Sequence, residues 1–204
     1  MSSALPLAGL RVLDYGQYVA APFATMLLAD LGADVVKVEP PRGDEWRRYD
    51  PFQPGESRYF YALNRGKRSI GLDISTDDGR ELLYKLVETA DVFVTNYLPQ
   101  VRAKLGIEVD DIRARNPDIV YVRGSGHGAR GPEAERGGFD GASFWARAGL
   151  AMTFKDPAAE WPVDQRPAFG DVLGGLTIAG GITSPASISA VTTAAHRSRR
   201  RWRT

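Results

Sequence analysis

The sequence predicts an α/β protein built on a Rossmann-like, mainly parallel sheet with flanking helices. Short runs rich in β-branched and apolar residues, which are typical of buried strands, recur along the chain and alternate with helical segments. The first strand, the first helix and the second strand together take only about 30 residues, as a parallel unit with a right-handed crossover requires.

Five strands are expected, at residues 10–15, 34–39, 68–74, 91–96 and 118–123. The first reads L-R-V-L-D-Y and ends in a turn around Gly16, where the glycine interrupts the apolar run. Two prolines and Gly43 break the chain after the second strand, and a polar, aromatic segment then extends to about Arg68.

Helices are predicted between these strands, at residues 21–31, 75–89, 100–105 and 110–116. In the first, Pro22 is tolerated because it lies in the opening turn, and Gly32 ends the helix. Residues 75–78 supply a cap and first-turn acids to the second.

The composition is that of a soluble globular protein: 204 residues, 43% hydrophobic and 25% charged, with a net charge of +1 that gives no case for nucleic acid. The absence of cysteine excludes disulfides, thiolate zinc sites and cysteine nucleophiles. The two histidines, His127 and His196, supply a metal site or a Ser-His-Asp triad poorly, so no metal is expected. The start lacks the features of a secretory signal, and the most apolar segment, 19–31, is too short and mixed to span a bilayer, so a cytoplasmic protein is expected.

The last segment, residues 184–204, is arginine-rich and without apolar periodicity, which predicts a disordered tail. A nucleic-acid-binding tail is the weaker alternative.

The stretch P-A-F-G-D-V-L-G-G, residues 167–175, holds a single carboxylate, Asp171, with no His, Lys or second acid in the segment. One interpretation is a helix N-cap, since a helical pattern follows and Asp caps helices well. The other is a nucleophile, which requires a bare anion with room around it.

The sequence does not support either of two familiar motifs, a dinucleotide-binding loop and a nucleophile elbow. G-S-G-H-G-A at 124–129 follows a strand, but the Gly131-Pro132 pair forces a further turn where a dinucleotide-binding helix would have to open, so an NAD site is disfavoured. No G-x-S-x-G nucleophile elbow occurs around Ser125 or Ser143.

Five blocks considered together carry a resemblance. In order they are L-A-G-L-R-V-L-D-Y-G-Q-Y-V-A-A-P, A-D-L-G-A-D-V-V-K-V-E-P-P-R-G-D, N-R-G-K-R-S-I-G-L-D, V-T-N-Y-L-P-Q-V-R-A-K-L-G and F-G-D-V-L-G-G. Over roughly residues 7–183 the chain resembles the family III CoA-transferases, a group that also holds formyl-CoA transferase, L-carnitine CoA-transferase and α-methylacyl-CoA racemase.

The resemblance implies that Asp171 is the nucleophile of a CoA-transferase and carries an aspartyl-CoA thioester between an acyl-CoA donor and a carboxylic acid acceptor. An Asp with its ordinary pKa near ~3.9 is anionic at pH 7 and needs no partner base. Neighbouring glycines would leave room for the thioester and offer N–H groups to a developing oxyanion.

Coenzyme A is expected as a substrate, with no tightly bound cofactor. The phosphates of CoA are usually bound by Arg or Lys side chains or by helix N-termini. By resemblance, the residues that contact CoA are Val19, Ala20, Arg42, Leu72, Asp73, Ser75, Asn96, Tyr97, Leu98 and Lys104. Lys67 and Arg68 are equally explained by structural roles.

Phe139 distinguishes two groups of enzymes within the family that the chain resembles. The racemases carry a His-Asp pair in this region, whereas R-G-G-F-D-G puts Phe at the position of the base. Because Phe cannot exchange a proton, acyl transfer is preferred and a racemase is the lesser alternative. The aromatic segment 139–147 suggests an apolar or aryl acyl group, although core packing explains it as well.

Members of this family are about twice as long, and they form interlocked homodimers with a second small domain and a glycine-rich loop over the nucleophile. We therefore expect residues 1–183 to be the N-terminal CoA-binding and catalytic domain, truncated before the second domain, and residues 184–204 to be a tail outside the family pattern. A weakly active or inactive fragment, and a non-catalytic CoA-binding module, are the alternatives.

Overall fold

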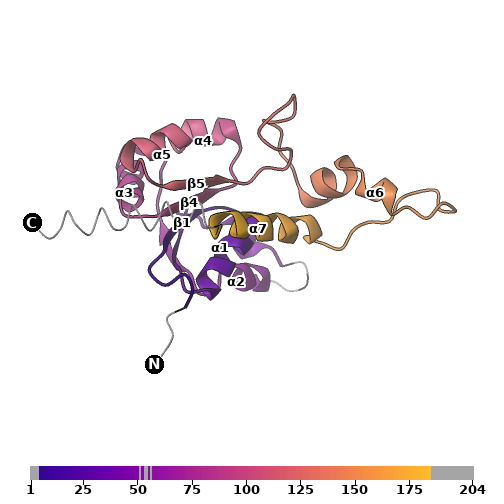
Figure 1. Cartoon of the computed structure of the whole chain (residues 1–204), viewed down its shortest axis with the longest axis horizontal. Coiled ribbons are helices and arrows are strands. Elements are labelled where there is room, and N and C mark those ends of the chain that lie inside the picture. The colour runs from indigo at the N-terminus through magenta and orange to yellow at the C-terminus, as the bar shows by residue number, and fades with distance from the viewer. Residues whose placement is uncertain (1–4, 51, 53–54, 56, 185–204) are drawn as a thin grey trace, which may run out of the picture.

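The sheet has five parallel strands in the order β3-β2-β1-β4-β5. The computed structural model describes residues 5–50, 52, 55 and 57–184. The strands are β1 (Arg11–Tyr15), β2 (Asp34–Glu39), β3 (Arg68–Gly71), β4 (Val92–Thr95) and β5 (Val120–Arg123) (Figure 1). The predicted α/β class and the parallel sheet are confirmed.

The third strand is three residues shorter than expected. The Leu72 N–H still donates to the Glu39 carbonyl oxygen of β2, at 2.8 Å. The chain then turns, because the Asp73 carboxylate accepts hydrogen bonds from the Ser75 backbone N–H and from the Ser75 hydroxyl.

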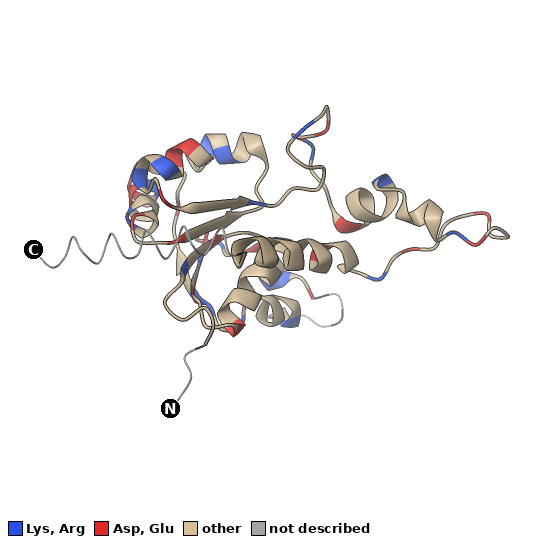
Figure 2. Ribbon diagram, in the orientation of Figure 1, with Lys and Arg blue, Asp and Glu red and all other residues tan. Residues whose placement is uncertain are grey.

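Helices cover both faces of the sheet (Figure 1). One face carries α1 (Ala20–Asp30), α2 (Arg58–Asn64) and α7 (Phe169–Ile182), and the other carries α3 (Asp77–Val87), α4 (Pro99–Leu105) and α5 (Val109–Arg115). Each face has its own apolar cluster, one around Phe93 and Leu83 and the other around Val92 and Leu28. Charged residues are more frequent along α4 and α5 than along α7 (Figure 2). Among the described residues, no helix has both the length and the apolar character needed to cross a membrane.

Four short elements were not expected from the sequence. The 3₁₀ helix η1 (Glu45–Arg48) and helix α2 lie inside the polar, aromatic segment, and each begins at a capping side chain, Asp44 or Ser57. The π-helix η2 (Asp140–Arg147) and helix α6 (Leu150–Thr153) follow β5. Nearly all of the arginine-rich tail, 185–204, and with it His196, lies outside the described residues.

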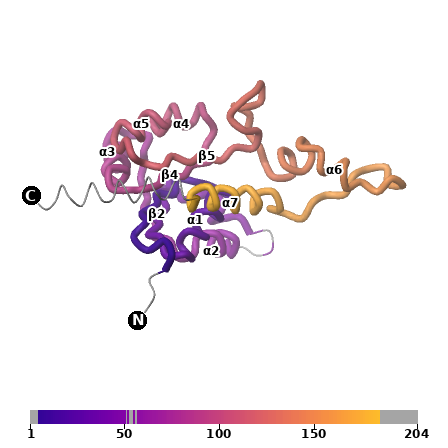
Figure 3. Tube along the Cα trace, in the orientation of Figure 1, coloured from indigo at the N-terminus to yellow at the C-terminus, as the bar shows by residue number. Residues whose placement is uncertain are grey.

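The chain between β5 and α7 leaves the sheet and projects to one side before returning (Figure 3). On its return, α7 packs against α1 at a close approach that only glycine allows. A Cβ built on Gly175 would lie 2.7 Å from Phe23 Cδ1 and 2.8 Å from the Ala20 carbonyl oxygen. This contact sets the position of the first turn of α7, where Asp171 lies.

Buried charges on β1 and β2 hold the turn that follows β1. Asp14 is fully buried and accepts hydrogen bonds from Lys67 Nζ at 2.8 Å, from the Thr25 hydroxyl at 2.7 Å and from the Gly16 N–H at 3.0 Å. Lys37, equally buried, donates to the Gly16 carbonyl oxygen at 2.9 Å and pairs with Asp44 at 3.0 Å. Burial alone would raise the pKa of Asp14, but Lys67 and Lys37 outweigh it and lower that pKa. The structural role allowed for Lys67 is therefore the one that the contacts support.

The close approach of α1 and α7 predicts opposite effects for two glycines of one helix. Gly175→Ala is expected to destabilise the protein by about 1–3 kcal/mol, because its methyl group overpacks the contact with α1. Gly180→Ala is the matched control, since a Cβ there meets nothing within 4 Å. It should stabilise the protein by up to about 1 kcal/mol through helix propensity. Urea denaturation of both variants checks this, and equal effects would contradict the packing described.

The buried ion pair predicts a large cost for Lys67→Met. That variant leaves Asp14 charged and buried without its nearest cation, so we expect a loss of about 3–5 kcal/mol in the free energy of unfolding. Arg68→Met, at the next position, removes an exposed ion pair with Asp34 and should cost less than about 1 kcal/mol. Similar losses for the two variants in chemical denaturation would show that the Lys67 pair does not carry this stability.

Candidate active site

The order of the strands reverses between β1 and β4, and the chains that leave these two strands diverge at their carboxyl ends. Such a switch point is the usual ligand site of an open α/β sheet. Here the side chain of Asn96 bridges the two loops. Its Oδ1 accepts from the Gln17 N–H at 2.9 Å, and its Nδ2 donates to the Gln17 carbonyl oxygen at 2.8 Å. Asn96 therefore holds the turn that carries Gln17.

Two non-glycine residues with a left-handed backbone lie in the segments that form this site. They are Tyr18, with φ of 60° in the turn after β1, and Ala168, with φ of 62° immediately before α7. This conformation costs an L-residue of order 1–3 kcal/mol and is found most often at functional sites. Both segments thus adopt a strained backbone where they approach the cavity described below.

Asp171 is the third residue of α7, which begins at Phe169 with Ala168 as its N-cap. Ala168 makes no side-chain hydrogen bond that would cap this helix. The N-cap interpretation of Asp171 is therefore wrong: the helix begins three residues earlier than it would if Asp171 were its N-cap. The carboxylate lies in the first turn, where a helix N-terminus favours negative charge.

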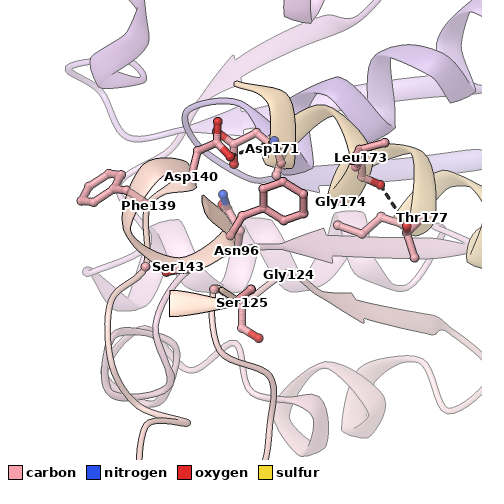
Figure 4. A pocket seen from close by; sticks show the side chains of 17 residues that line it. Asn96, Gly124, Ser125, Phe139, Asp140, Ser143, Asp171, Leu173, Gly174 and Thr177 are labelled. Carbon is pink, nitrogen blue, oxygen red and sulfur yellow. Dashed lines mark hydrogen bonds between the residues drawn. The ribbon is translucent and has the colours of Figure 1, made fainter. Parts of the chain in front are cut away.

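A cavity of about 440 Å³ opens in front of Asp171 (Figure 4). Much of its wall is small: the glycines that line it are Gly124, Gly126, Gly138, Gly170 and Gly174. Asp140, the first residue of η2, extends into the same space from the opposite wall, and Figure 4 shows its carboxylate beside that of Asp171. The arrangement leaves room for a reacting group against an acidic pair.

The environment raises the pKa of Asp171 to about 6, first because the side chain is partly buried and second because of the nearby Asp140 charge. This differs from the ordinary carboxyl expected from the sequence. Within the described part of the chain, no hydrogen bond or ion pair to the Asp171 carboxylate is found. At pH 7 roughly nine in ten of these groups are still ionised.

Asp140 is fixed by the backbone of α7. Its Oδ1 accepts from the Gly170 N–H at 2.8 Å, while Oδ2 is buried without a hydrogen-bond partner. Only glycine fits at position 170, since a Cβ there would lie 2.2 Å from Phe144 Cγ and 2.4 Å from Asp140 Oδ1. The Gly170 N–H next to Asp171 is thus already used, which differs from the expectation that the neighbouring glycines offer their N–H groups to an oxyanion. Sequence reasoning missed Asp140 as a partner of Asp171, although it is the only acid in the 139–147 segment.

The structure brings several residues predicted to contact CoA to the carboxyl edge of the sheet. Asp73 and Ser75 lie in the turn after β3, with Leu72 buried beneath them. Tyr97 stacks on Tyr15, with 5.0 Å between ring centroids, and burial raises the pKa of its hydroxyl. Arg42 itself is exposed and pairs with Glu45 at 3.4 Å.

The remaining predicted residues lie in different places. Ala20 lines the Asp171 cavity, and Val19 is the buried residue that precedes α1. Asn96, Tyr97 and Leu98 line a smaller cavity of about 260 Å³. Lys104 is exposed in α4 and lines neither of these two cavities.

Phe139 lines the Asp171 cavity and offers no group that could exchange a proton. His127 contacts Ser143 in the cavity wall, with 3.2 Å between Nε2 and Oγ, but it lines neither of these two cavities. The cavity in front of Asp171 is thus lined by a second carboxylate and several glycines, and His127 is not among its lining residues.

The raised pKa of Asp171 predicts a pH-dependent effect of Asp171→Asn. The folded protein favours the protonated acid, so this group's contribution to stability is complete below pH 3.8 and is lost as the pH rises through about 6. The variant should therefore be more stable than the wild type at pH 8 and indistinguishable at pH 3.5. Thermal denaturation at the two pH values measures this, and a variant that is less stable at pH 8 would contradict the burial of an unpaired charge.

The second cause of the shift predicts that Asp140→Asn lowers the pKa of Asp171. The amide keeps an acceptor for the Gly170 N–H but removes the negative charge, so only the contribution of burial remains. Asp118→Asn, in the exposed turn before β5, is the control and should leave the titration unchanged. Carbon-13 NMR titration of the Asp171 carboxyl reports both variants, and an unchanged midpoint in Asp140→Asn would show that the two carboxylates are not coupled.

Known proteins with similar sequences were compared with the chain. The model of CoA-transferase family III matches residues 7–191. A probable fatty acyl-CoA transferase of Mycobacterium tuberculosis is 42% identical over 67% of this chain and 36% of its own length. Mouse succinyl-CoA:glutarate CoA-transferase is 40% identical over 87% of this chain and 41% of its own length. Succinyl-CoA:mesaconate CoA-transferase of Haloarcula hispanica is 41% identical over 86% of this chain and 46% of its own length.

Solved structures agree with these matches. A protein of M. tuberculosis superposes with a TM-score of 0.80 and 35% identity, over 96% of this chain and 52% of that one. A CaiB/BaiF family protein of Brucella suis gives a TM-score of 0.81 and 35% identity, over 96% and 51%. The chain thus spans about half the length of these structures, or less than half that of the relatives above. On its sequence, its fold and the extent of the match, the chain belongs to CoA-transferase family III.

Proposed function

We propose that this chain carries the nucleophile and the CoA-binding half of a CoA-transferase, which moves CoA from an acyl-CoA to a carboxylic acid through an aspartyl-CoA thioester on Asp171. The observation that carries the proposal is the Asp171 carboxylate: half-buried, without a cationic partner among the described residues, and open to a glycine-walled cavity at the switch point of the sheet. Family membership supports the reaction class.

The cycle uses one carboxylate throughout. An Asp171 oxygen attacks the thioester carbonyl, the carbon–sulfur bond breaks, and a mixed anhydride and CoA thiolate result. The thiolate attacks the Asp171 carbonyl of the anhydride, which gives the aspartyl-CoA thioester and releases the donor's acid as its carboxylate. The acceptor carboxylate attacks that thioester and expels the thiolate. The thiolate then takes the acceptor's acyl group and frees Asp171.

The geometry favours the first step in two ways. A pKa of about 6 makes the Asp171 carboxylate more basic than an ordinary Asp and leaves it mostly ionised at neutral pH. The small cavity wall lets a thioester carbonyl approach closely, so positioning offsets the weak nucleophilicity of a carboxylate. Because Asp171 must be ionised, adduct formation should fall as the pH drops below about 6.

We propose that CoA lies along the carboxyl edge of the sheet, against Asn96, Tyr97 and Leu98, with Arg42 near a phosphate. The roles of Val19, Ala20, Leu72, Asp73, Ser75 and Lys104 remain part of this proposal. So do a cytoplasmic setting and an interlocked homodimer. The relatives' names include fatty acyl, succinyl–glutarate and succinyl–mesaconate transferases, so the names alone leave the acyl group open.

Two other functions are weighed. A non-catalytic CoA-binding module would keep CoA affinity without a covalent adduct, and nothing about the open Asp171 cavity favours it. A racemase would need a proton-exchanging group facing the substrate, and among the described cavity-lining residues the position next to Asp140 is Phe139. Acyl transfer therefore fits the geometry best.

The proposal predicts a covalent adduct on one residue. When the full chain is incubated with an acyl-CoA and hydroxylamine, peptide mass spectrometry should find a hydroxamate at Asp171, because hydroxylamine cleaves both an anhydride and an aspartyl thioester. Asp171→Asn should abolish it. Asp140→Asn should still form the hydroxamate, and the pH midpoint of adduct formation should shift to a lower value.

Three results bear on the alternatives. CoA affinity without any hydroxamate would support the non-catalytic module. A hydroxamate on another acid would overturn the role of Asp171. Loss of α-proton exchange in the Asp171→Asn variant, with no thioester adduct in the wild type, would favour a racemase.

A further inference from the structure

The Asp171 cavity is the middle part of a longer groove. On one side it continues into the 260 Å³ cavity, with which it shares Asn96, Gly124 and Ser125. On the other side it continues into a cavity of about 750 Å³, with which it shares Phe139, Asp140 and Asp171. A molecule bound across Asp171 therefore has one arm in each flanking cavity.

The two flanking cavities differ in charge. The smaller one is lined by Arg102 and Arg123 together with Glu108 and Glu135, and Arg102 pairs with Glu108 at 3.1 Å, so its charges balance. The larger one is lined by Asp140, Asp164 and Asp171, and among the described residues that line it there is no Lys, Arg or His. Phosphates are therefore repelled from the larger cavity, and Arg123 is the cation of the smaller one that has no ion pair among the described residues.

The larger cavity has an apolar wall that is open to solvent. Trp161 is 75% exposed and Phe139 is 70% exposed, so neither ring serves to pack the core. Trp145 fixes the wall: its indole N–H donates to the Val163 carbonyl oxygen at 2.9 Å and thereby ties residues 161–165 to η2. The core-packing explanation of the aromatic segment thus does not hold for Phe139.

The polar side chains of this wall also bear on the acyl group. Gln165 is a neutral one among them. A substituent that carries its own carboxylate would meet the three acids Asp140, Asp164 and Asp171.

We infer that the larger cavity receives the acyl group, and that this group is an apolar or aryl monocarboxylic acyl chain, not a dicarboxylic one. The inference rests on the proposed function for the placement of the thioester at Asp171. It assigns to Phe139, Trp161 and Val163 the role of specificity-determining residues for acyl transfer.

The test compares two free acids with the full chain, so that it does not depend on turnover. 4-Phenylbutyrate and glutarate are titrated, and binding is followed by the indole NMR signals of Trp145 and Trp161. 4-Phenylbutyrate should perturb both signals and bind about tenfold or more tightly than glutarate, since it buries apolar area and carries no second charge. Trp161→Ala should remove most of this preference, whereas Trp46→Phe, in η1 and outside this cavity, should not.

A variant that adds a positive charge to the cavity tests the same inference by favouring the dicarboxylic acid. Val163 is exposed in the cavity wall, so Val163→Arg introduces a cation there with little risk to folding. The ratio of the affinity for 4-phenylbutyrate to the affinity for glutarate should fall at least threefold, because the cation improves glutarate binding. Stronger glutarate binding in the wild type, or no response of either indole to 4-phenylbutyrate, overturns the inference.

The outcomes separate this inference from the proposed function. Equal rates of Asp171 adduct formation from hexanoyl-CoA and glutaryl-CoA would overturn the inference and leave the transferase proposal standing. Preferential binding of 4-phenylbutyrate without any adduct would support the acyl cavity and count against transfer through Asp171.

Discussion

The unpaired, half-buried carboxylate of Asp171 is the constraint around which the site is arranged. A charge in this position is destabilising for the folded protein, and the raised pKa is the measure of it. Its position depends on the close packing of α7 against α1 at Gly175, and on Gly170, where a side chain would collide with Phe144 and Asp140. Gly170 and Gly175 are therefore required by packing, whereas a Cβ at Gly174, Gly180 or Gly181 would meet nothing within 4 Å.

Asp14 and Asp171 show how the charge of a neighbouring group changes the pKa of a buried carboxyl. Asp14 is fully buried, yet two lysines hold its pKa below the ordinary value and it serves the structure. Asp171 is less buried, but its nearest charged neighbour is another acid, and its pKa rises. Burial acts to raise the pKa in both cases, and the sign of the neighbouring charge decides whether the pKa ends below or above its ordinary value.

The sequence predicted the fold well, because strands and helices of an α/β sheet carry strong local signals. All five strands were located, and only β3 differed by more than a residue or two, since its end is set by a contact with Glu39 and a turn at Asp73. Helix α7 was predicted to begin after Asp171, because the αL residue that starts it is an alanine and gives no capping signal.

The site was only partly predictable. Asp171 was identified from the blocks around it, but its coupling to Asp140 joins residues 31 positions apart and comes from a π-helix without a sequence signature. The clamp of Asn96 on Gln17 and the burial of Lys67 and Lys37 depend in the same way on the parallel arrangement of strands, which brings distant turns together. Local patterns cannot report such contacts.

The central claim is that the Asp171 side chain itself takes up CoA. The most direct measurement is borohydride reduction of the full chain after incubation with an acyl-CoA, followed by sequencing of the peptide that contains position 171. An aspartyl-CoA thioester at that position is reduced to homoserine, and the account predicts homoserine at 171 and at no other acid. An unmodified Asp171 under conditions in which the donor loses its acyl group would contradict it.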